Sequence, residues 1–280
     1  MLVHGLDESG FVWDDLAPEL AAAGLTAVRF DYSNDQSISR TTDQLAGELR
    51  RLREAGVQRI DLVGHSMGAL AIRDLLTRGD VYGGNASAAA AEGLPSVDRF
   101  IMLAAPNHGS ALAPLQPLSE AREHLARKLE QNSAAGDGWI HSTRDGQGEA
   151  AVDLTEGSEF LHELNARPLP TDVRITNIVA RMVGSTERQR LRSALKRGLA
   201  DVLDPEGARA VTGYVDEALD ALGDGLVSAD SMMLEGVTDT VEVKANHRSM
   251  IRRMRVFGDD SAGYTPPAIP IIVNRLAEPQ

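Results

Sequence analysis

Short apolar runs alternate along the chain with segments whose apolar residues recur every three or four positions. The runs have the length and composition of buried strands, and the periodic segments have the spacing of amphipathic helices. The predicted strands cover residues 1–3, 25–32, 59–64, 99–106, 173–181 and 240–246, and the predicted helices cover residues 41–56, 69–76 and 266–278. Apolar strands separated by helices indicate a mostly parallel sheet flanked by helices. The pattern predicts a single α/β domain over residues 1–280.

Two long stretches interrupt this alternation as insertions. The first covers about residues 109–167 and the second about residues 184–222. The second contains two apolar helix faces, one marked by Leu191, Leu195 and Leu199 and the other by Val211, Val215 and Leu222. Periodicity does not distinguish two packed helices from a mobile lid over a site, so both interpretations stay open. A low-complexity segment at residues 83–95 is predicted to be a surface loop.

Composition and charge narrow the classes of partner. The chain has 280 residues, of which 42% are hydrophobic and 25% are charged, an ordinary balance for a globular protein. Its 28 Lys and Arg residues and 41 Asp and Glu residues give a net charge of −13. Such a surface repels nucleic-acid phosphates, so we expect no nucleic-acid partner. No run of eighteen or so apolar residues is present, so no transmembrane segment is predicted.

The absence of cysteine excludes disulfides and thiolate metal sites. No signal peptide is visible, because Met1 leads directly into "LVHG" without a basic segment or a full apolar segment. These first residues read as the tail of a buried strand. We therefore expect that strands which usually come before it are missing from the chain, and the cellular compartment stays open.

The segment "GHSMG", residues 64–68, stands where a predicted strand meets a predicted helix. A turn this tight forces its central residue into a strained conformation, and side chains two positions away would collide with the neighbouring strand and helix. Glycine at Gly64 and Gly68 removes the collision. The serine hydroxyl is then held above the sheet edge, beside the N-terminus of a helix. We predict that Ser66 is a catalytic nucleophile.

A serine nucleophile needs a general base, which in turn needs a carboxylate that orients it. The chain has seven histidines. His65 lies inside the turn, and its side chain is expected to point away from the position that Ser66 uses. His247 follows the last predicted strand, at the carboxyl edge of the sheet where Ser66 also emerges. We predict that His247 is the base.

Two aspartates compete for the role of the orienting carboxylate. Asp224 lies between Gly223 and Gly225, which permit a tight turn, and it falls between the serine and the histidine along the chain. Asp230 lies six residues further on, in "SADSM", a pattern that suits a helix start, where aspartate caps the N-terminus. We predict Asp224 as the acid, with Asp230 as the alternative.

Attack by a serine on a carbonyl carbon also requires N–H groups that stabilise the resulting oxyanion. Met67 follows the predicted nucleophile and opens a helix. The loop after the first strand, "VHGLDES", supplies the second donor, because Gly5 lets the backbone approach and Leu6 follows it. We predict an oxyanion hole formed by the N–H groups of Leu6 and Met67.

Taken together, these motifs resemble those of α/β-hydrolases of the serine lipase and esterase type, close to bacterial lipases and to proteins like the GPI inositol deacylases. Those that carry the resemblance are "VHGL", "GHSMG", "LAAPNHGS", "DLTEGSEFLHELN", "GDGLVS" and "NHRSM", which span nearly the whole chain. The resemblance implies an α/β-hydrolase fold and cofactor-free hydrolysis of carboxylic esters, often lipids. The "HGL" loop is similar to that of lipases acting on medium or long acyl chains, and the resemblance allows contact with a lipid interface.

Three functions stay open. The first is a serine esterase or lipase, the second an acyltransferase that uses the same residues, and the third a non-catalytic binding module on a hydrolase scaffold. Metal catalysis is disfavoured, because no His and Glu spacing of the metalloprotease type is present. His4 and Asp7 could suggest a ligand pair, but a packed loop is the favoured interpretation.

Overall fold

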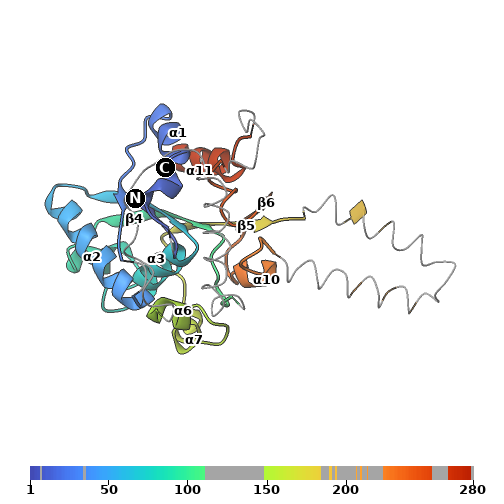
Figure 1. Ribbon diagram of the computed structural model, residues 1–280. Coiled ribbons are helices and arrows are strands. Elements are labelled where there is room, and N and C mark those ends of the chain that lie inside the picture. The colour runs from blue at the N-terminus through green and yellow to red at the C-terminus, as the bar shows by residue number, and fades with distance from the viewer. Residues whose placement is uncertain are drawn as a thin grey trace, which may run out of the picture.

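The structure, a computed structural model, describes residues 1–6, 8–33, 36–110, 148–183, 223–253 and 264–278, together with the isolated positions 189, 190, 193, 206, 209 and 213. Its centre is a six-stranded sheet with the order β2-β1-β3-β4-β5-β6, in which every neighbouring pair is parallel (Figure 1). The strands are β1 (Leu2–Val3), β2 (Arg29–Phe30), β3 (Arg59–His65), β4 (Ser96–Leu103), β5 (Arg174–Arg181) and β6 (Asp239–Lys244).

Helices cover both faces of this sheet (Figure 1). They are η1 (Gly10–Trp13), α1 (Leu16–Ala22), α2 (Ile38–Glu54), α3 (Met67–Thr77), α4 (Ala86–Ala91), α6 (Glu149–Asp153), α7 (Glu159–Ala166), α10 (Ala229–Met232) and α11 (Ala268–Ala277). Alternate residues of the strands point to opposite faces. Leu103 therefore packs with α1 and α11, whereas Met102 packs with α2 and α3. The predicted parallel α/β fold is confirmed.

The order of the strands indicates that a ligand site lies at the carboxyl ends of β1 and β3. From β1 the chain crosses to β2 on one side, and from β3 it crosses to β4 on the other side. β1 and β3 are neighbours, with Leu2 paired to Val63 and Val3 to Gly64. In open parallel sheets, the crevice outside the carboxyl ends of two such strands is the usual place for a ligand. The loops that begin at His4 and at Ser66 both leave the sheet at this point.

Carboxylates of the first insertion bind the N-terminus of α2. Asp153 accepts a hydrogen bond of 2.8 Å from the Ile38 N–H, and Glu149 accepts one of 3.2 Å from the Ser37 N–H. The N-cap residue Ser37 makes no side-chain cap of its own. The two carboxylates therefore satisfy amide groups that a helix leaves without partners, and they fix α6 to α2.

The strand predicted at residues 25–32 is shorter than expected, because only Arg29 and Phe30 pair with β1. The predicted loop at residues 83–95 is wrong, because it contains α4. Asn85 caps this helix by accepting a hydrogen bond of 3.0 Å from the Ala88 N–H. Its residues are mostly alanine, which has the highest helix propensity. The loop was predicted from the low-complexity composition, without weighing this propensity.

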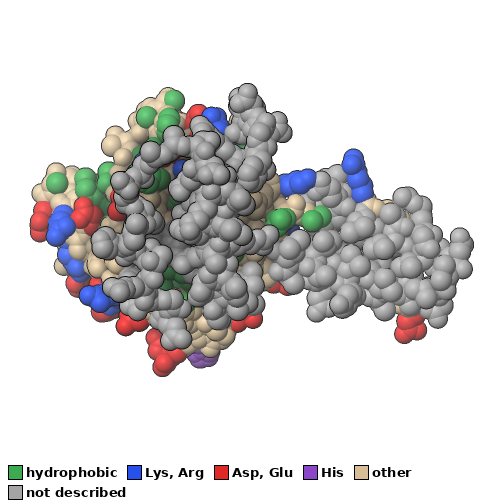
Figure 2. Space-filling view, viewed as in Figure 1, with side chains coloured by type: hydrophobic (Ala, Val, Ile, Leu, Met, Phe, Trp, Pro, Cys, Tyr) green, Lys and Arg blue, Asp and Glu red, His purple; other side chains and the backbone are tan. Residues whose placement is uncertain are grey.

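The two predicted insertions are described unequally. The first contains α6 and α7, and its residues 111–147 lie outside the described part. Almost all of the second, residues 184–222, also lies outside it, so the choice between packed helices and a lid stays a prediction. Within the described ranges, no helix combines the length and the apolar character that crossing a bilayer requires. Acidic and basic side chains intermingle on the surface over α2 (Figure 2, left).

Candidate active site

Ser66 occupies the strained turn that the sequence predicts. It links β3 to α3 with φ 53° and ψ −126°, a left-handed conformation that residues other than glycine rarely adopt. The two neighbouring glycines are required by space. A Cβ on Gly64 would lie 2.6 Å from the Ala69 Cα, and one on Gly68 would lie 2.6 Å from the Val3 carbonyl oxygen. The chain therefore keeps a strained serine half-buried at the carboxyl edge of the sheet.

Asp224 and His247 form a buried pair. The Nδ1 atom of His247 lies 2.6 Å from the Oδ2 atom of Asp224, and the His247 N–H donates to the Asp224 carbonyl at 3.1 Å. The Oδ1 atom of the same carboxylate accepts hydrogen bonds from the N–H groups of Leu226 (2.9 Å) and Val227 (2.8 Å). The carboxylate is thus held by its own loop and leaves one oxygen for the imidazole.

The electrostatics of this pair favour an ionised aspartate. Burial alone would raise the pKa of Asp224, but His247 and the two N–H groups lower it below its ordinary value. Burial alone would lower the pKa of His247, but Asp224 and then Glu8 raise it above its ordinary value. Two carboxylates therefore stabilise the imidazolium that forms when His247 accepts a proton.

The predicted oxyanion loop lies against the serine. A Cβ on Gly5 would lie 2.8 Å from the Ser66 Cβ, so only glycine permits this approach. Met67 is the first residue of α3, and Leu6 forms a turn after β1. Neither the Leu6 N–H nor the Met67 N–H donates to an acceptor among the described residues. Within that part of the chain, both amides therefore lack an acceptor at the edge where Ser66 emerges.

Asp230 lies apart from this pair. It is exposed in the first turn of the short helix α10. The helix start at "SADSM" is confirmed, but the capping role expected for Asp230 is wrong. Ser228 is the N-cap, and its side chain accepts from the Ser231 N–H. Serine and aspartate are both favoured at the N-cap, so the sequence could not discriminate between Ser228 and Asp230 for this role.

Among the described residues, no histidine side chain other than that of His247 bonds to Asp224. His108 and His162 are exposed, and His124 and His141 fall outside the described residues. His4 is buried, its ring stacks on Tyr32 with centroids 4.3 Å apart, and the Tyr32 hydroxyl donates to the His4 carbonyl at 2.6 Å. These contacts agree with the packed-loop interpretation of His4, and Asp7 lies outside the described part. No group of three potential metal ligands occurs among the described residues.

Sequence reasoning missed Glu8, whose carboxylate lies against the active-site loops. Its Oε2 atom lies 2.7 Å from the His65 Nδ1 atom and accepts a hydrogen bond of 2.9 Å from the Gly5 N–H. The His65 ring lies 4.7 Å from the ring of His247, the predicted base. Glu8 was visible in the segment "VHGLDES", but its partner His65 is 57 positions away along the chain.

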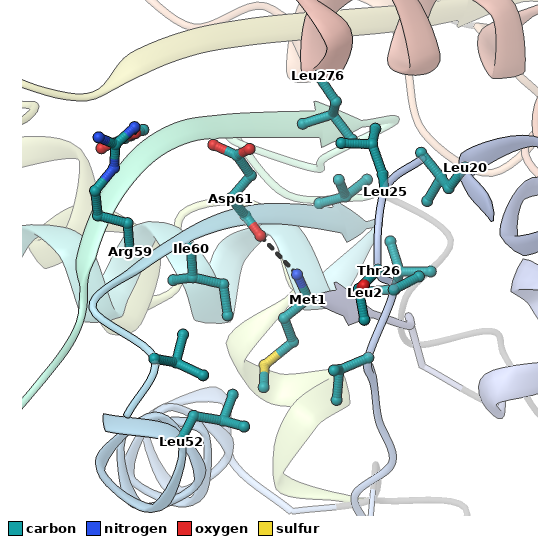
Figure 3. Close-up of a pocket in the computed structure, with 15 residues that line it drawn as sticks. Met1, Leu2, Leu20, Leu25, Thr26, Leu52, Arg59, Ile60, Asp61 and Leu276 are labelled. Atoms are coloured by element: carbon teal, nitrogen blue, oxygen red, sulfur yellow. Dashed lines mark hydrogen bonds and ion pairs between the residues drawn. The ribbon is translucent and has the colours of Figure 1, made fainter. Parts of the chain in front are cut away.

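A separate pocket of about 320 Å³ opens at the opposite edge of the sheet. Met1, Ile60 and Asp61, at the amino ends of β1 and β3, contribute to its lining, and the Met1 amino group donates to the Asp61 carbonyl (Figure 3). Ser66 lies at the carboxyl ends of the same parallel strands. This pocket is therefore not part of the candidate active site.

Comparisons with known proteins agree with the fold. No curated protein matches the chain. The mature lipase BlEst2 of Bacillus licheniformis is similar in structure, with a TM-score of 0.58 and 21% identity over 97% of this chain and 90% of the lipase. The metagenomic carboxyl esterase MGS0156 has a TM-score of 0.56 and 20% identity over 99% of this chain and 74% of the esterase.

A family model described as the alpha/beta hydrolase family matches residues 1–258. The match includes β1 to β6, the turn at Ser66 and the loops that carry Asp224 and His247. The chain therefore belongs to the alpha/beta hydrolase family.

Proposed function

We propose that this protein is a serine hydrolase that cleaves carboxylic esters, as a lipase or esterase, through an acyl-enzyme intermediate on Ser66. His247 is the general base, Asp224 orients it, and the N–H groups of Leu6 and Met67 stabilise the oxyanion. The observation that carries the proposal is the 2.6 Å contact between His247 and a backbone-held Asp224, together with a strained serine that follows a strand at the carboxyl edge of the same sheet. The similar structures named above are a lipase and a carboxyl esterase, which supports the same reaction class.

The reaction follows from the chemistry of these groups. The Ser66 hydroxyl loses its proton to His247 as its oxygen attacks the ester carbonyl carbon. The negative charge that moves onto the carbonyl oxygen is stabilised by the two N–H groups and by the positive end of α3. The intermediate collapses when His247 returns the proton to the departing alcohol. Water then attacks the acyl-enzyme by the same route and releases the acid.

The Asp224 carboxylate contributes in two ways. It accepts the Nδ1 hydrogen, which leaves the Nε2 atom of His247 as the basic atom, and its charge stabilises the imidazolium. It does not need to take the proton itself. Its lowered pKa agrees with this role, because it stays ionised while His247 titrates.

A panel of p-nitrophenyl esters with short to long acyl chains tests the proposal. We expect hydrolysis by the wild-type protein, and a fall in kcat of at least about a thousandfold for Ser66→Ala. Ser96→Ala, at the start of β4, is the matched control and should keep wild-type turnover. Turnover by Ser66→Ala at the wild-type rate would contradict the proposal. Product analysis with added alcohols separates hydrolysis from acyl transfer to another acceptor.

A further inference from the structure

The carboxylate of Glu8 connects the three segments that meet at the candidate active site. Its Oε2 atom accepts from the Gly5 N–H in the oxyanion loop and contacts His65 Nδ1 in the serine turn. Its Oε1 atom lies 3.4 Å from the Nε atom of Arg248, the residue that follows the proposed base His247. The side chain is only 5% exposed. One buried carboxylate therefore contacts a residue adjacent to Leu6, one adjacent to Ser66 and one adjacent to His247.

The two hydrogen bonds of His65 define its protonation state. Its Nδ1 atom faces the Glu8 carboxylate at 2.7 Å, and its Nε2 atom lies 2.9 Å from the His247 carbonyl oxygen. A carbonyl oxygen and a carboxylate only accept hydrogen bonds, so both ring nitrogens must donate. The Glu8 carboxylate is ionised, because it also accepts from Gly5 and faces Arg248.

We propose that Glu8 and a doubly protonated His65 form a buried ion pair that positions the oxyanion loop and the His247 loop around Ser66. Glu8 is a positioning residue in this arrangement, since it acts through His65 and Gly5 and touches no reacting atom. The inference rests on the proposed function for its consequence in catalysis. The ion pair itself is a property of the folded protein and is measurable without substrate.

Charge gives Glu8 a second effect, on the base. Burial would raise the pKa of Glu8, but His65, His247 and Arg248 together lower it to about 2. The negative charge of Glu8 in turn raises the pKa of His247. Around His247, the charged groups are then Asp224 and Glu8, which favour the imidazolium, and Arg248 and the protonated His65, which oppose it.

The variant Glu8→Gln removes the charge and keeps the size of the side chain. We expect kcat to fall by between about ten- and a hundredfold, because the oxyanion loop loses its fixed anchor. We also expect the acidic limb of the profile of kcat/KM against pH to move to lower pH, since one of the groups that raise the pKa of His247 is gone. The control is Asp61→Asn, a half-buried carboxylate at the amino end of β3. Its acidic limb should coincide with that of the wild type.

The outcomes separate the two proposals. An unmoved acidic limb in Glu8→Gln contradicts the inference, even if kcat falls, because a purely structural defect produces that result. Wild-type kcat with a wild-type profile also overturns it. Absence of ester hydrolysis by the wild-type protein contradicts the proposed function instead, and leaves the ion pair to be decided spectroscopically.

Nitrogen NMR of histidine-labelled wild-type protein determines the protonation state of His65 and requires no substrate. We expect both ring nitrogens of His65 to carry a hydrogen at neutral pH, because one faces the Glu8 carboxylate and the other faces the His247 carbonyl oxygen. Replacement His65→Gln assigns the resonances. An unprotonated ring nitrogen on His65 at neutral pH would overturn the proposal.

Discussion

The Oδ2 atom of Asp224 lies 2.6 Å from the Nδ1 atom of His247, while its Oδ1 atom is held by the N–H groups of Leu226 and Val227. The carboxylate is therefore fixed on one side and directed at the imidazole on the other. This arrangement distinguishes Asp224 from Asp230, which is exposed in α10.

We expect Asp224→Asn to lower kcat on the order of a thousand- to ten-thousandfold at neutral pH, because His247 loses its orientation and its imidazolium loses its partner. Asp230→Asn should leave turnover near normal and change the free energy of unfolding by no more than about 1 kcal/mol, since it is an acidic residue in the first turn of a helix. Steady-state kinetics and thermal melts measure both variants. If Asp230→Asn is inactive and Asp224→Asn is active, then Asp230 is the orienting carboxylate and the proposed role of Asp224 is wrong.

The glycines of the serine turn give a prediction about stability. An alanine Cβ at Gly68 would lie 2.6 Å from the Val3 carbonyl oxygen and closer still to that of His4. Backbone atoms cannot rotate away, so Gly68→Ala should lower the free energy of unfolding by at least about 2 kcal/mol. Gly47→Ala is the control, because nothing lies within 4 Å of a Cβ in the middle of α2. It should raise stability by about 0.5–1 kcal/mol. Urea denaturation measures both, and equal effects would contradict the steric account.

The contact between α6 and α2 predicts a capping effect. Asp153→Ala removes the acceptor of the Ile38 N–H and should lower the free energy of unfolding by about 1 kcal/mol. Glu163→Ala, exposed within α7, is the control and should stay within about 0.5 kcal/mol of the wild type. Chemical denaturation at pH 7 compares the two. A larger loss for Glu163→Ala than for Asp153→Ala would contradict the capping role.

The raised pKa of His247 sets the direction of the pH dependence. Only the neutral imidazole accepts the serine proton, so kcat/KM rises with pH as His247 deprotonates. Because Asp224 and Glu8 raise this pKa, the midpoint of the acidic limb should lie above the ordinary value of 6.5. Hydrolysis of a short-chain nitrophenyl ester, followed at a wavelength where product absorbance is independent of pH, measures the midpoint. A midpoint below about 6 would mean that burial dominates over the two carboxylates.

The same raised pKa affects stability in the opposite direction. A histidine whose pKa is raised in the folded state stabilises the fold fully below its unfolded pKa, and this contribution is lost as pH rises through the folded pKa. Glu8 and Asp224, whose pKa values are lowered, stabilise the fold above their unfolded pKa values, and that contribution is lost on acidification.

The sequence predicts much of this molecule because local rules dominate where the chain is regular. The apolar runs of β3, β4 and β5 lie where the pattern places them, and the two glycines around Ser66 are needed for the steric reason given by their spacing. Motif order along the chain also favoured Asp224, which lies against His247. The strand and glycine signals are each contained within a few consecutive residues, and the order of the motifs along the chain needs no knowledge of contacts.

The missed features depend on contacts that no local pattern records. Glu8 meets His65 across 57 positions, and Asp153 reaches Ile38 across 115 positions. The side chain of His65 was expected to point away from the position that Ser66 uses, and its contacts with Glu8 and with the His247 carbonyl could not be foreseen from the turn alone. Partners of this kind become visible only when the sheet brings the loops together.

Covalent labelling tests the central claim most directly. A fluorophosphonate reacts with an activated serine, so wild-type protein should gain a single adduct, and mass spectrometry of its peptides should place that adduct on Ser66. The folded variants Ser66→Ala and His247→Ala should remain unlabelled, and Ser96→Ala should be labelled at the wild-type rate. Labelling of another residue, or undiminished labelling of Ser66→Ala, would contradict the account.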